Sequence, residues 1–165
     1  MDLNGIPSYI ETTSESLRNN TIFINKMEDL VAHLTPHLRL VEPVITPRFV
    51  PTCTEALLRG LTEMAKERGV RIQSHLSESK DQMAWSTAMW GGKTDVQVFD
   101  SLGLLGPTSL MAHCTHATPP VFALLAERDT SIAHCPLSNF YFSATTSAPS
   151  RSVGSGLRCR ARERK

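Results

Sequence analysis

The amino-acid sequence predicts an α/β fold built around a parallel sheet. Four short apolar runs, near residues 40–47, 70–75, 109–113 and 130–134, have the composition of strands. The stretches between them carry apolar residues at helical spacing. Strands that alternate with helices form repeated βα units, and such units place their strands parallel to one another in one sheet.

The first helix is expected at residues 14–34, where apolar residues follow a helical period. These residues are Leu17, Ile24, Met27, Val31 and Leu34. Thr12 and Glu15 stand before the helix with the spacing of a capping box. The next stretch, LRLVEPVITPRF at residues 38–49, contains a β-branched apolar run that is typical of a buried strand.

A second capping-box pattern, formed by Thr52 and Glu55, precedes the second helix. The apolar residues of this helix are Leu57, Leu58, Leu61, Met64 and Ala65. Gly69 is expected to end it, because glycine readily adopts the left-handed conformation that follows a helix. The next strand then occupies residues 70–74.

The rest of the chain continues this alternation of helices and strands. The expected elements are helices at residues 80–90 and 94–102, a strand at 109–112, a helix after Thr118 and a strand at 130–133. Thr118 can cap its helix because Pro119 is well suited to the first helical position.

Polar residues that can carry chemistry follow each predicted strand. Arg48, His75, His113 and His134 all lie at or just beyond a strand end, and Glu78 comes three residues after His75. In parallel α/β folds, ligand sites lie at the carboxyl ends of the strands. The sequence therefore predicts that these side chains gather at one mouth of the fold.

This set of residues suits the hydrolysis of a planar, polar substrate. A neutral imidazole is a good ligand for zinc, and a zinc-bound water becomes nucleophilic near neutral pH. Glu78 lies close to His75 along the chain and could move the protons. Arg48 offers a fork of donors for a carbonyl oxygen or an anion. Phe49 can stack on a flat ring.

Each of these residues also has a structural interpretation. A histidine after a strand is often structural, and Arg48 can belong to a surface ion pair. Cys114 and Cys135 are expected to be small packing residues. Trp85 and Trp90 are likewise expected to pack rather than to stack on a substrate.

Five sequence stretches occur in the order in which a known family carries them. They are MDLN, VITPRF, IQSHLSES, MAHC and SIAHCPLSN. In these stretches the chain resembles the guanine deaminases of the amidohydrolase superfamily. The resemblance implies an incomplete (β/α)8 TIM barrel of the metal-dependent hydrolase type, with about four to five βα units. It also implies a zinc cofactor, hydrolysis of guanine to xanthine and ammonia, and a homodimer for the whole protein.

The resemblance assigns a role to individual residues. His75 is similar to the family's zinc ligand on the fifth barrel strand, and Glu78 to its proton-shuttling glutamate. His113 is similar to the histidine that faces the attacking water and the reacting carbon. Arg48 and Phe49 match the pair that holds the purine, through its oxygen and by ring contact. The HCPLSN stretch is assigned to the shape of the mouth.

Two parts of the family pattern do not occur in this sequence. The family carries an HxH pair of zinc ligands on its first strand and an aspartate in a GTD-like stretch after its eighth strand, and the chain has neither. We therefore expect a fragment that is inactive by itself. The alternatives are a non-catalytic half-barrel that pairs through its open edges, a basic-tail binding module, or a hydrolase of another purine or a pterin.

Charge and composition divide the chain in two. Residues 1–143 are expected to form the partial amidohydrolase barrel, and residues 144–165 a disordered basic tail without an apolar period. No apolar run reaches the length of a membrane span, and the N-terminus does not resemble a signal peptide. We expect a cytoplasmic protein whose partner is a small purine, guanine, with no membrane or nucleic acid partner.

Overall fold

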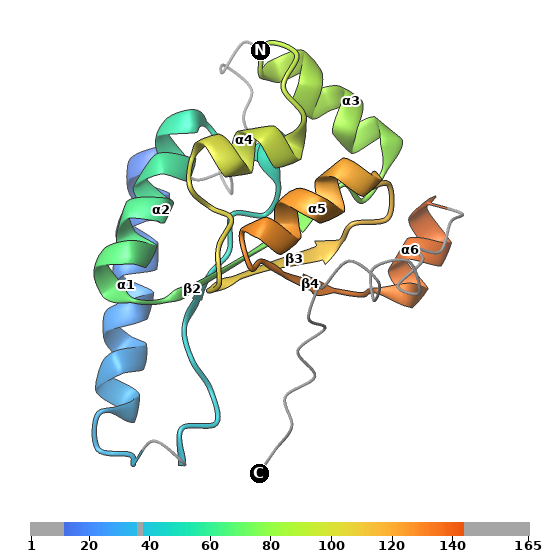
Figure 1. The fold of residues 1–165 in the computed structure, drawn as a ribbon. Coiled ribbons are helices and arrows are strands. Elements are labelled where there is room, and N and C mark those ends of the chain that lie inside the picture. The colour runs from blue at the N-terminus through green and yellow to red at the C-terminus, as the bar shows by residue number, and fades with distance from the viewer. Residues whose placement is uncertain (1–11, 36–37, 144–165) are drawn as a thin grey trace.

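The structure is a computed structural model that describes residues 12–35 and 38–143 (Figure 1). Its elements are α1 (Thr13–Val31), β1 (Val44–Ile45), the 3₁₀ helix η2 (Val50–Thr52), α2 (Glu55–Arg68), β2 (Arg71–Leu76), α3 (Lys80–Met89), α4 (Asp95–Ser101), β3 (Ser109–His113), α5 (Pro119–Glu127), β4 (Ser131–Ala133) and α6 (Pro136–Ser143). The MDLN stretch and the basic tail predicted at residues 144–165 lie outside the described residues.

The strands form one parallel sheet in the order β1-β2-β3-β4. In register, Ile45 lies beside Ile72, Gln73 beside Leu110, and Met111 beside Ile132. Strands that are neighbours in the chain are also neighbours in the sheet, and helices connect them (Figure 1). The predicted parallel α/β fold is therefore confirmed.

The helices bury one face of the sheet. The buried residues of β2 are Ile72, Ser74 and Leu76. Arg71 and Gln73 of the same strand are exposed on the other face, and Leu110 of β3 is 38% exposed. Parallel sheets are usually covered on both faces. Within residues 12–35 and 38–143, this sheet therefore has a covered face and an open face.

The core lies between the helices and the covered face. Its fully buried members include Leu58 of α2, Leu76 of β2, Phe99 of α4, Met111 of β3 and Leu125 of α5. Burying a side chain of this size contributes about 1.5–3 kcal/mol. The core thus links α2, α4 and α5 to strands β2 and β3.

The beginning of α1 is as predicted, but its end is not. Thr12 and Glu15 form both hydrogen bonds of the capping box. Ile24 and Val31 are buried, and Leu17 packs against the core. The helix ends at Val31, so the predicted last turn, up to residue 34, is not helical.

The predicted cap of α2 is wrong by two residues. Thr52 belongs to η2, and its hydroxyl donates to the carbonyl oxygen of Phe49. The hydroxyl of Thr54 accepts from the N–H of Leu57 instead, which makes Thr54 the N-cap. Gly69 ends the helix with a φ of +63°, as predicted.

Three other elements differ from the prediction. The first strand is confined to Val44–Ile45, because Pro43 and Pro47 flank it and proline has no N–H for the ladder. Helix α6 was not predicted as a helix. Thr118 does precede α5, but its side chain makes no capping hydrogen bond.

No helix in the described part of the chain is long and apolar enough to cross a membrane.

Candidate active site

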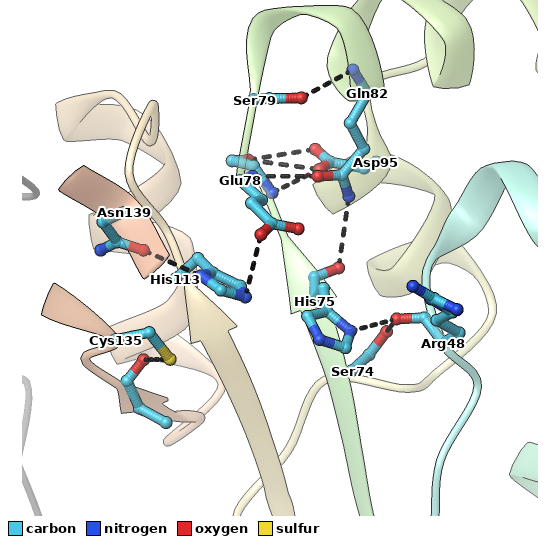
Figure 2. A network of polar contacts seen from close by, with 12 residues as sticks. Arg48, Ser74, His75, Glu78, Ser79, Gln82, Asp95, His113, Cys135 and Asn139 are labelled. Atoms are coloured by element: carbon cyan, nitrogen blue, oxygen red, sulfur yellow. Dashed lines mark hydrogen bonds and ion pairs between the residues drawn. The ribbon is translucent and has the colours of Figure 1, made fainter. Parts of the chain in front are cut away.

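Arg48, His75, Glu78 and His113 lie together at the carboxyl end of the sheet, whereas His134 is exposed and does not line the cavity described below. The rings of His75 and His113 stack, with their centroids 5.1 Å apart and their planes at 21°. Glu78 comes from the turn after β2, and its Oε1 lies 3.4 Å from His113 Nε2. Figure 2 shows Glu78 between the two strand ends, with Arg48 on the β1 side of His75.

A cavity of about 510 Å³ opens at this end of the sheet. It is lined by Arg48, Phe49, His75, Glu78, Ser79, Asp81, Gln82 and Trp85. His113 is not among the lining residues, because it is only 5% exposed and reaches Glu78 from within the fold. The site thus has an accessible wall and a buried imidazole that contacts one residue of that wall.

The imidazole of His75 is held with one nitrogen free. Its Nδ1–H donates to the backbone carbonyl oxygen of Arg48 at 2.6 Å. The same oxygen accepts from the backbone N–H of His75 and from the hydroxyl of Ser74 (Figure 2). A neutral imidazole that donates through Nδ1 presents the lone pair of Nε2, and this is the arrangement that metal-binding histidines require.

One ligand does not make a zinc site. A catalytic zinc usually has three protein ligands and an open position. In residues 12–35 and 38–143, no group of three or more His, Cys, Asp or Glu side chains is placed to hold a metal. His75 therefore fits as a single ligand, and the described residues do not complete the set.

His113 is oriented by a buried amide. The residue has a φ of +74°, which is unusual for a residue other than glycine. Its Nδ1–H donates to Oδ1 of Asn139, which lies in α6 and is fully buried. The bond leaves Nε2 facing the Glu78 carboxylate.

Arg48 and Phe49 follow β1 at the edge of the cavity. The guanidinium carbon of Arg48 lies 5.8 Å from the centroid of the Phe49 ring. Arg48 is exposed and Phe49 is half-buried. A fork of donors beside a partly exposed ring can hold a flat molecule by its oxygen and by its face.

Of the two cysteines near the site, Cys114 is buried and Cys135 is half-buried. Burial raises the pKa of the Cys114 thiol, and the nearby carboxylate of Asp95 adds to the effect. Cys135 donates to the carbonyl oxygen of Ala133 (Figure 2). A thiol whose pKa is raised has little thiolate at neutral pH and is a poor nucleophile.

Sequence reasoning missed several residues around the site. Trp85 was expected to pack, but it is 43% exposed and lines the cavity. Gln82 and Trp85 follow Glu78 at intervals of four and three residues, the spacing of one helix face. That spacing was the available signal.

Asn139 contacts His113 from within the HCPLSN stretch, which was assigned only to the shape of the mouth. Asp95 contacts Ser77, directly before Glu78, from α4, and no local pattern points to such a partner.

Comparison with known proteins places the chain among hydrolases. The model of the Amidohydrolase family matches residues 6–159, a span that runs past the predicted boundary at residue 143. The chain is 37% identical over 145 residues to the guanine deaminase of Dictyostelium discoideum, and 36% identical over 146 residues to that of Rattus norvegicus. Each alignment covers 87% of this chain and 31% of the relative, so the chain spans about a third of their length.

Solved structures agree with these relatives. The guanine deaminase from C. acetobutylicum with bound guanine is 32% identical, with a TM-score of 0.81 over 93% of this chain and 36% of that chain. The E. coli guanine deaminase is 26% identical, with a TM-score of 0.77 over 93% of this chain and 34% of that chain. The expected resemblance and the expected fold class are both confirmed.

Proposed function

This chain belongs to the amidohydrolase family, and we propose that it carries the substrate-holding and proton-transferring part of a guanine deaminase site. The observation that carries the proposal is the contact of Glu78 with His113 beside the cavity that Arg48 and Phe49 line. The overall reaction would be the hydrolysis of guanine to xanthine and ammonia.

The substrate end of the site would be formed by Arg48 and Phe49. The guanidinium would donate to the carbonyl oxygen at C6 of guanine, and the Phe49 ring would contact the face of the purine. Their closeness, 5.8 Å from guanidinium carbon to ring centroid, suits a single flat ligand. Adenine has an amino group at C6, so its N–H donors would face the N–H donors of the Arg48 guanidinium.

Glu78 would move the protons of the reaction. Water adds to C2, the bond from C2 to the exocyclic nitrogen breaks, and the nitrogen leaves as ammonia. The carboxylate would take a proton from the water and deliver it to the leaving nitrogen. His113 would hold the carboxylate in place through Nε2, because Asn139 keeps its other nitrogen occupied.

Zinc, when bound, would supply a more acidic water as the nucleophile. His75 would hold it through Nε2, since its Nδ1–H is committed to the Arg48 carbonyl. Two further ligands would have to come from outside the described residues, because none of these forms a ligand group with His75. A non-catalytic half-barrel is therefore the second candidate for the chain by itself.

Purine binding by the 165-residue chain tests the substrate assignment. In nuclear magnetic resonance (NMR) titrations, guanine should shift the signals of the Arg48 guanidinium and the Trp85 indole N–H, whereas adenine should not. Arg48→Ala should remove the response, and Arg39→Ala, away from the cavity lining, should keep it. Equal responses to guanine and adenine, or no response to either, would overturn the assignment.

The other expectations remain proposals of the same kind. We propose that residues 1–143 form one unit and residues 144–165 a separate basic tail, on the strength of composition alone. A cytoplasmic location and a homodimer of the whole protein stay predictions.

A further inference from the structure

The turn that carries Glu78 has an unusual backbone conformation. Ser77, directly before Glu78, has a φ of +47° and is almost fully buried. Residues other than glycine rarely adopt this left-handed backbone conformation, because their Cβ approaches the following carbonyl oxygen. A serine in this conformation needs contacts elsewhere in the fold that hold it there.

The Ser77 carbonyl oxygen accepts from the backbone N–H of His116 at 2.9 Å. The contacts to the Ser77 N–H and hydroxyl come from Asp95, the first residue of α4. Its Oδ2 accepts from the backbone N–H of Ser77 at 2.7 Å, and its Oδ1 accepts from the N–H of Val96 at 2.8 Å. The Ser77 hydroxyl lies within 3.3 Å of both oxygens. Asp95 is fully buried, so these bonds are shielded from water. Figure 2 shows the carboxylate beside the Glu78 turn.

The geometry requires a carboxylate rather than an amide. Two backbone N–H groups, from Ser77 and Val96, point at two different oxygens of Asp95. An asparagine offers one oxygen and one NH₂ group, so one of the two backbone donors would face another donor. A buried donor without an acceptor is costly, and the turn would move to relieve it.

A second bridge ties the turn to β2. Gln82 of α3 accepts from the backbone N–H of Glu78 at 3.1 Å, and its amide lies 3.5 Å from the carbonyl oxygen of His75. This bridge is longer and nearer to solvent than the Asp95 bonds. It fixes Glu78 relative to its own strand, whereas Asp95 fixes the turn relative to α4.

We infer that Asp95 is a positioning residue, whose buried carboxylate holds Ser77 in the left-handed conformation and so sets Glu78 against His113. Without this anchor, the Glu78 backbone would relax toward an ordinary turn, and its carboxylate would leave the 3.4 Å contact with Nε2. The inference rests on the proposed function only in that Glu78 is the proton carrier. The geometric claim stands apart from it.

The test is an NMR comparison of variants of the 165-residue chain. Asp95→Asn should lose the nuclear Overhauser contacts between the side chains of Glu78 and His113, and the exchange protection of the Ser77 amide. Ser77→Ala keeps the backbone N–H and should keep both signals. Ser109→Ala is the matched control, because it removes a buried side-chain bond to the Leu104 carbonyl at the far end of β3.

The outcomes separate a positioning role from a merely structural one. Contacts that persist in Asp95→Asn, or that are lost equally in Ser109→Ala, would overturn the inference. Should Asp95→Asn fail to fold, the original chain still decides: a Ser77 amide that exchanges as fast as that of exposed Lys80 would overturn it. If Asp95→Asn loses the contact but the original chain does not bind guanine, the proposed function is overturned and the inference about Asp95 stands.

Discussion

At the level of single residues, the proposed chemistry depends on the pair formed by Glu78 and His113. His113 donates through Nδ1 to Asn139, so only Nε2 is left to meet the Glu78 carboxylate. A carboxylate beside an open cavity suits a group that takes and returns protons during hydrolysis.

The first prediction replaces this carboxylate in a full-length relative, such as the enzyme of Dictyostelium discoideum. Changing the glutamate that corresponds to Glu78 to glutamine should lower the rate of deamination by about 10²–10⁴-fold. Glutamine keeps the shape of the side chain but cannot carry the proton. The measurement is xanthine formation, with zinc content as the control, since zinc should stay bound. A variant that retains more than a tenth of the rate would contradict the prediction.

The second prediction concerns the pH dependence of stability at Asp95. Burial raises the pKa of this carboxyl above its usual value, and the Ser77 N–H bond offsets the effect only in part. The folded chain therefore binds this proton more tightly than the unfolded chain does. The resulting stabilisation is present below the unfolded pKa and is lost as the pH rises through the folded pKa.

Urea unfolding of the original chain and of Asp95→Asn across the acidic range measures this effect. The free energy of unfolding of the original chain, relative to the variant, should fall as the pH rises above about 4 and then level off. A difference that grows with pH would show that the site favours the carboxylate. The expected sign means that the buried carboxylate costs stability, as positions kept for function often do.

At the level of helices and strands, the long periodic patterns were predictable and the short elements were not. Strand β2 and helix α2 follow directly from alternation and from apolar spacing. Strand β1 has only two residues, fewer than predicted, because the prolines on both sides of it cannot donate to the hydrogen-bond ladder. Helix α6 was missed because a short helix has little pattern of its own, although it supplies Asn139.

The candidate site shows the same division. Arg48, His75 and His113 could be placed from their positions at strand ends, because parallel strands gather their carboxyl ends. Asp95 could not be found in this way. Its role depends on packing between α4 and a turn 18 residues earlier in the chain, and no local sequence pattern records such a contact.

The third prediction tests the cap of α2, where the sequence pattern indicated the wrong threonine. Thr54→Ala should lower the free energy of unfolding by about 1 kcal/mol, because the Leu57 N–H loses its acceptor. The Thr54 hydroxyl also contacts that of Thr13 at the start of α1, so the loss affects both helices. Thermal or urea unfolding measures the change.

Thr52→Ala is the matched control for this cap. The Thr52 hydroxyl donates to the Phe49 carbonyl within η2 and makes no capping bond to α2. Its removal should therefore cost less than the removal of Thr54. An equal or larger loss for Thr52→Ala would support the cap that the sequence pattern predicted.

At the level of the whole molecule, the sheet determines what this chain can do. In the described residues, β1 and β4 are the outer strands, and the open face carries exposed side chains such as Gln73 and Leu110. Backbone groups at a sheet edge are available for pairing with further strands. A complete barrel of this type closes eight strands on each other, and the described sheet has four.

The last prediction follows from this incomplete site. The 165-residue chain should bind zinc weakly, because His75 is prepared as one ligand and the described residues offer no group of three. With zinc and guanine added, it should form no xanthine or ammonia above background, since the strongest nucleophile of such a site depends on the bound metal. The assay uses the purified chain beside a full-length relative at equal concentration. A tenfold rate difference corresponds to only about 1.4 kcal/mol. Turnover within about tenfold of the relative that is lost in His75→Ala would therefore contradict the prediction. It would place the missing ligands within this chain.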